Sequence, residues 1–387
     1  MTETLQRLLT DEAEALDVPL PDEVLIRARG RGYRTRRRIT SGIVSVAVAA
    51  SCAVVATAAL PGLLADRVPQ DTPAGGWNAE AAQSAYAQDG AFSVGSDIYF
   101  GPSAAFVVHS NDKIKSFYYT SAGVVVRTGE KAYLDDAGPS NYLLARPDGS
   151  TQRLQIALSD VAPDSDPIWP YLAYVTSGTT SAWVLHIFDV EQNEEAARVP
   201  FNGAFTWGGW AAPPVALDGD HAYVGLDDGR LEINWRSRSP GALDASGAST
   251  FPVVSGGRVL LERDLPQPGD TWRTEITVRD VTTGEVLFQQ ETADEFAQLS
   301  PDGRFLSVSE FVMIDGPATD GRVIDLLDGS EQPFAIQEGR GWTPSGRLMY
   351  VTDTGVRTCD ADTGACRNYP HQLSGGRIKV GGTNYES

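Results

Sequence analysis

A turn motif that recurs about every 40–45 residues places the strongest constraint on the fold of this chain. It reads Ser-Pro-Asp-Gly-Arg at residues 300–304 and Thr-Pro-Ser-Gly-Arg at residues 343–347, and an apolar run follows each copy. A second turn ending in Asp-Gly or Thr-Gly follows in most units, as in Asp280-Val-Thr-Thr-Gly284. Glycine supplies the positive φ that a tight hairpin needs. The motif therefore predicts a series of similar units of short antiparallel strands.

The spacing of the copies indicates how these units assemble. Successive turn glycines are 38, 46 and 43 residues apart, at positions 219, 257, 303 and 346. Such a period, with about four short strands per unit, is typical of a β-propeller, whose small sheets bury their faces against one another. We count six units, which start near Lys113, Ile168, Trp210, Phe251, Phe296 and Arg340. Residues 97–110 and 377–380 are left over, and we expect them to share one composite closing blade. The expected fold is all-β, a propeller over residues 96–387, with seven blades favoured and six as the alternative.

The turn at residues 300–304 resembles those of WD40-like and TolB-like β-propellers, and the resemblance spans roughly residues 96–387. It implies the fold and leaves the function open. The Gly-His and Trp-Asp pairs of true WD40 units are absent from the sequence, so the resemblance does not imply an intracellular scaffold.

A long apolar run precedes the repeats. Residues 39–65 carry no charged side chain and directly follow Arg36-Arg37-Arg38. A helix needs about 20 apolar residues to cross a bilayer core, so we expect a transmembrane helix over residues 39–62. The chain is basic before this run and acidic after it, which predicts a cytoplasmic N-terminus and an extracytoplasmic propeller. A cleaved export signal is the alternative, because residues 35–39 resemble a twin-arginine signal and Ala56-Thr57-Ala58 offers a cleavage pattern.

The segments that flank this run differ in charge. Residues 1–38 hold eight Arg and seven Asp or Glu, a net charge of +1; the whole chain carries −20, so the remainder carries −21. Such an acidic surface repels nucleic acid, which we exclude as a partner of the propeller. Residues 63–95 are rich in Pro, Gly, Ala and Gln and predict a linker, with some helix around residues 80–87.

The head, residues 1–38, has two interpretations. It is either a basic cytoplasmic anchor or a docking segment for a cytoplasmic partner. A short head before a single span resembles actinobacterial membrane proteins associated with extracytoplasmic-function sigma factors, which makes sigma-factor regulation a candidate role. The His-x₃-Cys-x₂-Cys pattern of zinc-binding anti-sigma domains is absent.

The chain has three cysteines, of which Cys52 lies inside the apolar run. Cys359 and Cys366 flank the turn signal Asp362-Thr363-Gly364, and a hairpin there places the two thiols opposite each other on neighbouring strands. An oxidising exterior permits a disulfide between them. Two free buried thiols are the alternative. No second Cys pair or His cluster accompanies them, so we expect no metal site.

No catalytic or cofactor-binding motif occurs in the sequence: there is no Gly-x-Ser-x-Gly turn, phosphate-binding loop or His-Glu-x-x-His. The four histidines lie in different units, and we interpret them as structural. Two groups of aspartates could in principle hold calcium: Asp160, Asp164 and Asp166, and Asp218 with Asp220. Neither group has the pattern of an EF-hand loop, and we interpret both as turn-forming residues. Phe205, Trp207 and Trp210 either line a binding surface for sugar or peptide or fill gaps between blades.

These observations favour a membrane-anchored, non-catalytic, extracytoplasmic propeller that binds a protein or a small ligand, with a signalling role open. The alternative is a hydrolase or lyase on the same scaffold, with acidic residues in the central channel. A His–carboxylate pair there would favour the enzyme. A purely structural envelope protein is the third interpretation.

Overall fold

A computed structural model describes residues 77–101, 104–107, 113–130, 140–156, 158, 161, 163–178, 182–206, 211–244, 251–265, 273–293, 295–310, 319–336, 339–370 and 378–382. The predicted head, the predicted span 39–62 and the first part of the predicted linker lie outside these residues. Within the described ranges, no helix is both long and apolar enough to cross a membrane.

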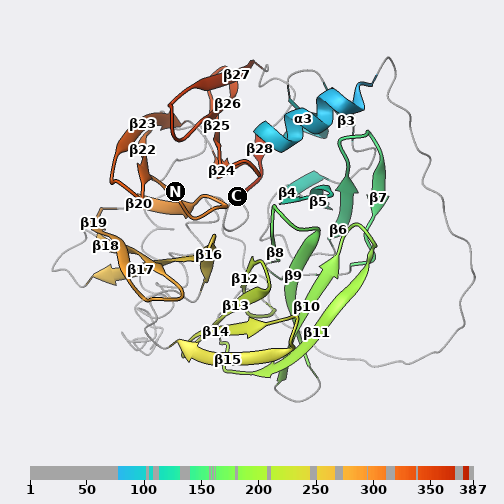
Figure 1. Cartoon of the computed structure of the whole chain (residues 1–387). Helices are drawn as coiled ribbons and strands as arrows, with labels where there is room; N and C mark the ends of the chain where they lie inside the picture. Colours follow the sequence, from blue (N-terminus) through green and yellow to red (C-terminus); the bar gives the residue numbers. More distant parts are fainter. Residues whose placement is uncertain are drawn as a thin grey trace, which may run out of the picture. The chain divides into compact units, whose positions relative to one another are not determined.

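The described strands form seven four-stranded antiparallel sheets, numbered here as blades in chain order; Figure 1 labels most of the strands. Blade 1 contains β28 (Ile378–Val380), β1 (Phe92–Val94), β2 (Asp97–Phe100) and β3 (Ala104–Val107). Blade 2 contains β4 (Lys113–Thr120), β5 (Gly123–Gly129), β6 (Asn141–Ala145) and β7 (Thr151–Arg153). Blade 3 contains β8 (Asp164–Ser165), β9 (Tyr171–Ser177), β10 (Ala182–Asp189) and β11 (Glu194–Asn202).

The remaining four blades follow the same order. Blade 4 contains β12 (Val215–Asp218), β13 (His221–Leu226), β14 (Gly229–Asn234) and β15 (Ser239–Asp244). Blade 5 contains β16 (Val253–Ser255), β17 (Arg258–Leu265), β18 (Arg273–Asp280) and β19 (Val286–Thr292). Blade 6 contains β20 (Glu295–Leu299), β21 (Phe305–Glu310), β22 (Thr319–Asp325) and β23 (Glu331–Ile336). Blade 7 contains β24 (Arg340–Trp342), β25 (Leu348–Thr352), β26 (Gly355–Cys359) and β27 (Cys366–Pro370).

The first strand of each blade lies nearest the centre of the propeller. Contacts join β28 to β4, β4 to β8, β8 to β12, β12 to β16 and β16 to β20. The second strands are buried on both faces, as in β5, where Val124, Val125 and Val126 are fully buried. A strand covered by neighbours on both sides needs an apolar run rather than alternation, which explains the apolar runs after the repeated turns.

Both ends of the described chain meet in blade 1, which confirms the composite closing blade and the seven-blade architecture. β28 pairs antiparallel with β1, with Val380 opposite Phe92 and Ile378 opposite Val94. Tyr119 of the adjacent β4 donates a hydrogen bond from its hydroxyl to the Ala91 carbonyl at 2.6 Å. The six-blade alternative is therefore wrong, because it left the two terminal segments without a shared sheet.

In blades 2–7 the two hairpin turns emerge at the same edge of the sheet, and we call the surface that these turns form the turn face. It comprises the turns between first and second strands and between third and fourth strands, at residues 121–122, 146–150, 166–170, 190–193, 219–220, 235–238, 256–257, 281–285, 300–304, 326–330, 343–347 and 361–365. The repeated motif explains why these turns pair. In blades 5, 6 and 7 the motif arginine forms an ion pair with the aspartate that opens the second turn; the pairs are Arg258–Asp280, Arg304–Asp325 and Arg347–Asp360.

A helix, α3 (Ala79–Asp89), precedes β1 and crosses the turn face. Asn78 caps its first turn by accepting a hydrogen bond from the Ala81 amide, and Gly90 ends it with φ of 69°. The Tyr86 hydroxyl lies 2.7 Å from the carbonyl oxygens of Thr120 and Gly123 in blade 2. The end of the predicted linker 63–95 thus packs into the propeller, and its expected helix is present.

Candidate binding pocket beside a disulfide

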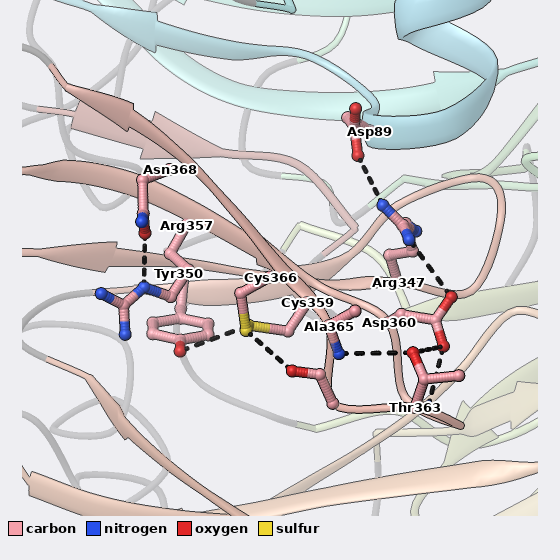
Figure 2. The surroundings of a disulfide bond; sticks show 11 residues. Asp89, Arg347, Tyr350, Arg357, Cys359, Asp360, Thr363, Ala365, Cys366 and Asn368 are labelled. Atoms are coloured by element: carbon pink, nitrogen blue, oxygen red, sulfur yellow. Dashed lines mark hydrogen bonds and ion pairs between the residues drawn. A yellow bond between two sulfur atoms is a disulfide. The ribbon is translucent and has the colours of Figure 1, made fainter.

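Cys359 and Cys366 form a disulfide, which confirms the predicted pairing (Figure 2). They occupy directly opposite positions on β26 and β27, with their Cα atoms 4.1 Å apart. The turn between them is held by Asp360, whose Oδ1 accepts hydrogen bonds from the backbone amide and hydroxyl of Thr363. The sequence places the cysteines correctly because this turn fixes the hairpin register.

A pocket of about 390 Å³ lies between blades 6 and 7, and the disulfide forms part of its wall. This volume is within the range of small-molecule sites, which are about 300–1,000 Å³. Its floor is apolar, because Val323, Leu348 and Tyr350 are buried. Polar groups stand at its edge, contributed by Asp320, Gln332, Arg357 and Asp360.

Two aromatic rings shape the apolar part of the pocket. The rings of Phe334 and Tyr350 lie 5.4 Å apart between centroids, one from each blade. The Phe334 ring lies against Gly321 of β22, where an added Cβ atom would come within 2.5 Å of the ring. The Tyr350 hydroxyl lies 3.5 Å from the Cys359 sulfur. Glycine at 321 therefore sets how deeply Phe334 lies on the blade.

Arg357 is the cationic group of the pocket. Its side chain is half-buried, and its Nε donates to Asn368 Oδ1 at 2.6 Å. Within the described part of the chain its two terminal nitrogens make no hydrogen bond, and no carboxylate forms an ion pair with it. A guanidinium with two free donor nitrogens beside an apolar floor suits an anionic group attached to an apolar body.

A second groove, between α3 and β27, has a different character. Its volume is about 650 Å³, and its charged centre is Asp89, which is only 2% exposed. Arg367, Arg347 and the Tyr369 hydroxyl lie 2.8, 3.3 and 2.6 Å from the Asp89 carboxylate. These partners already satisfy the carboxylate, so this cluster holds α3 to blade 7.

The predicted aromatic surface is only partly described. Phe205 is half-buried and packs edge-to-face on Trp183, with ring centroids 6.1 Å apart. It also borders the core shared by blades 2, 3 and 4. Trp207 and Trp210 lie outside the described residues, so the binding surface over Phe205, Trp207 and Trp210 stays a prediction.

Blade 3 contains a hydroxyl–histidine–carboxylate chain that sequence reasoning missed. His186 Nε2 lies 2.8 Å from Thr176 Oγ1, and His186 Nδ1 lies 2.9 Å from Glu195 Oε2. The three residues come from β9, β10 and β11, so the chain crosses the blade away from its innermost strand. Neither pocket described above includes any of them. Only strand register brings these residues together, and their sequence spacing carries no motif.

Three of the aspartates singled out in the sequence join neighbouring blades, whereas Asp220 forms an ion pair with Arg236 of its own blade. Asp164 Oδ2 accepts from the Leu217 amide and Asp166 Oδ2 from the Gly219 amide, each at 2.8 Å. Asp218 repeats this arrangement one blade further on, accepting from the amides of Gly256 and Gly257. Burial raises the pKa of Asp164 to about 7, and the nearby negative charges of Asp166 and Asp218 add to the shift. In the described ranges no group of three or more His, Cys, Asp or Glu residues is arranged to hold a metal ion, and Asp160 lies outside them.

Comparison with known proteins finds similarity to solved structures alone. No family model and no curated protein matches it. Among solved structures it is similar to TolB from Acinetobacter baumannii, with 15% identity, a TM-score of 0.34, and coverage of 63% of this chain and 62% of that one. It is also similar to PorZ from Porphyromonas gingivalis, with 12% identity, a TM-score of 0.44, and coverage of 72% and 36%. The β-propeller domain of the Trilobed protease from Pyrococcus furiosus has 10% identity, a TM-score of 0.42, and coverage of 67% and 86%. At these identities and TM-scores the likenesses supply no activity for this chain.

Proposed function

We propose that this protein is a membrane-anchored, extracytoplasmic, non-catalytic propeller that binds an anionic ligand with an apolar body between blades 6 and 7. The observation that carries the proposal is Arg357, whose terminal nitrogens make no hydrogen bond to the described residues while it borders a pocket with an apolar floor. The ligand's carboxylate or phosphate belongs to a small molecule or to a side chain of a protein partner, since the recognising chemistry is the same.

Two sequence features support the proposed location. The uncharged run at residues 39–65 is long enough to span a bilayer, and the charge asymmetry around it favours export of the propeller. The Cys359–Cys366 disulfide is consistent with an oxidising compartment. Neither feature depends on the identity of the ligand.

The test uses the full-length protein purified in detergent from its native membranes. Wild type is compared with Arg357→Gln and with Arg273→Gln, a matched control in which an exposed arginine of blade 5 loses its surface pair with Glu291. Native mass spectrometry detects a bound small molecule, and pull-down detects a protein. We expect the ligand or partner with wild type and Arg273→Gln, and its loss with Arg357→Gln. Equal retention by all three would assign binding to another part of the molecule.

The head, residues 1–38, is a separate element of the proposal. We infer that it faces the cytoplasm and docks a partner there, with a sigma factor as the candidate that the resemblance implies. A pull-down with the full chain and with a chain lacking residues 1–38 separates the two sites. A partner lost only with the head makes the protein a transmembrane signalling protein.

The Thr176–His186–Glu195 chain is the observation that favours a hydrolase instead. A histidine between a hydroxyl and a carboxylate can activate the hydroxyl as a nucleophile. His186→Gln would then abolish hydrolysis of ester or amide substrates by the purified protein at a temperature where the variant, which loses both hydrogen bonds of a buried ring, is still folded. Absence of hydrolysis in wild type removes this alternative.

A further inference from the structure

The turn face carries a set of exposed apolar side chains that no contact within the described chain explains. Four large apolar residues of the described ranges are strongly exposed: Ile168, Trp169, Val286 and Leu327, at 61%, 48%, 46% and 73%. The first two lie in the turn between β8 and β9 of blade 3. Leu327 lies in the second turn of blade 6, and Val286 directly follows the second turn of blade 5. All four therefore stand on one face of the propeller, distributed over three blades.

The Ile168–Trp169 tip is held in place by its neighbours. Pro167 and Pro170 flank it and fix the backbone φ angle on both sides. Asp166 Oδ1 accepts a hydrogen bond from the Ile168 amide at 2.8 Å, and the Trp169 carbonyl accepts one from the Ser121 amide of blade 2 at 3.3 Å. A rigid tip loses little conformational entropy on binding, which is the property of an anchor for a partner.

The first described residue after the predicted membrane span, Trp77, contacts the propeller on the turn face. Trp77 donates from its indole nitrogen to the Pro147 carbonyl at 3.0 Å and packs against Gly149, in the second turn of blade 2. Residues 63–76 lie between the predicted span and Trp77, and a fully extended chain of this length reaches at most about 50 Å. The tether therefore holds the turn face at a high local concentration near the bilayer.

We propose that the turn face rests on the bilayer surface, with Ile168, Trp169 and Leu327 inserted at the headgroup level. Tryptophan suits this position because it combines a large apolar ring with a polar N–H. The lipid expected is zwitterionic, because the arginines of the repeated turns are already paired with aspartates, as Arg236 is with Asp220, and the strongly acidic chain repels anionic headgroups. This inference rests on the proposed membrane anchor and is independent of the ligand pocket.

The test reconstitutes the full-length protein in phosphatidylcholine vesicles whose acyl chains carry bromine, which quenches nearby tryptophan fluorescence. Trp169→Phe keeps an apolar tip but removes its fluorophore. Trp183→Phe is the matched control, because Trp183 lies near the start of β10, at the edge of blade 3 opposite the turn face. We expect bromolipid quenching to fall strongly in Trp169→Phe and to stay at the wild-type level in Trp183→Phe. The double variant Ile168→Glu/Leu327→Glu should also lose quenching, because its tips no longer insert.

Carbonate washing of the same vesicles separates failure of the anchor from failure of the docking surface. If the protein stays in the washed vesicles while Trp169→Phe is quenched as strongly as wild type, the docking inference is wrong and the anchor stands. If carbonate removes the protein from the vesicles, the proposed membrane anchor is wrong, and the docking inference that rests on it is wrong too. A photoreactive side chain at position 168 that cross-links in native membranes to a protein or to a second copy, rather than to lipid, would also overturn it.

Discussion

Asp89, the last residue of α3, lies 2.8 Å from Arg367 on the outermost strand of blade 7, and 278 positions of sequence separate them. The same carboxylate also meets Arg347, the motif arginine of that blade, which links it to Asp360 beside the disulfide (Figure 2). One buried carboxylate thus joins the segment before the first strand of the propeller to its last complete blade. The closure of the ring depends on this contact as well as on the pairing of β28 with β1.

Replacing Asp89 by Asn should destabilise the propeller. The buried carboxylate accepts hydrogen bonds from two guanidinium groups and one hydroxyl, and bonds to charged groups are worth about 1.5–3 kcal/mol each. Because Arg367 is half-exposed and regains water, we expect a net loss of about 2–3 kcal/mol in the free energy of unfolding. Urea denaturation measures it.

Asp353→Asn is the matched control for this substitution. Asp353 is an exposed carboxylate of the same blade with no ion pair to the described residues. Its replacement should leave the unfolding midpoint unchanged. Equal midpoints for Asp89→Asn and Asp353→Asn would show that α3 is not part of the closure.

Truncation of the segment before residue 96 is a second test of how the ring of blades is closed. A chain that starts at residue 96, the sequence-predicted domain boundary, lacks α3 and β1 and leaves β28 with no strand to pair with. Blade 1 then has exposed edges, which promote aggregation. We expect residues 76–387 to give a cooperative thermal transition and residues 96–387 to aggregate or unfold without one. A cooperative transition in the shorter chain would contradict the structural role of residues 77–95.

The sequence predicted most of this fold because the repeated turns carry their own signal. Gly303 and Gly346, with φ of 69° and 76°, occupy positions that require positive φ, so turn chemistry alone located the hairpins. Residues 97–110 and 377–380 remained outside the six counted units, and this remainder predicted the composite blade. β1 was missed because three residues, Phe92–Val94, are too short to show periodicity, and only their pairing with β28 identifies them as a strand.

The candidate site was far less predictable. Arg357 and Phe334 come from different blades and line the same pocket only when the blades pack. No local sequence pattern therefore predicts the pocket. The disulfide on its wall was predictable, because both cysteines belong to one hairpin. The Thr176–His186–Glu195 chain likewise depends on the register of three strands. Contacts within a hairpin are local in sequence, whereas contacts between blades are not.

Removing the disulfide should weaken blade 7 without unfolding the propeller. The bond closes a short loop, with a sequence separation of 7. By restricting the unfolded chain it stabilises the folded state by about 2–3 kcal/mol. We expect Cys359→Ser/Cys366→Ser to lower the free energy of unfolding by this amount, and the reductant dithiothreitol to affect wild type but not the double variant. Mass spectrometry of the unreduced wild type should show the two cysteines linked. A wild type with both thiols free would contradict this structure.

The seam between blades 3 and 4 should make stability depend on pH through Asp164. Burial raises its pKa to about 7 in the folded protein, against 3.8 for the free side chain. Between these two values the folded state holds a proton that the unfolded state has released, so the free energy of unfolding falls as pH rises from about 4 to 7. The loss of stability is complete above pH 7. The shift in pKa corresponds to at most about 4 kcal/mol, and we expect a smaller loss because the side chain is only half-buried and water screens its charge.

Asp164→Asn removes this contribution, because an amide carries no charge at any of these pH values and its oxygen can still accept from the Leu217 amide. The variant should therefore be more stable than wild type above pH 7, and the difference should shrink to near zero by about pH 4. Urea denaturation at several pH values measures this difference, and Asp353→Asn should follow the wild-type curve throughout. A constant offset between Asp164→Asn and wild type would mean that Asp164 is ionised in the folded protein across the whole range, and that the blade seam tolerates the buried charge.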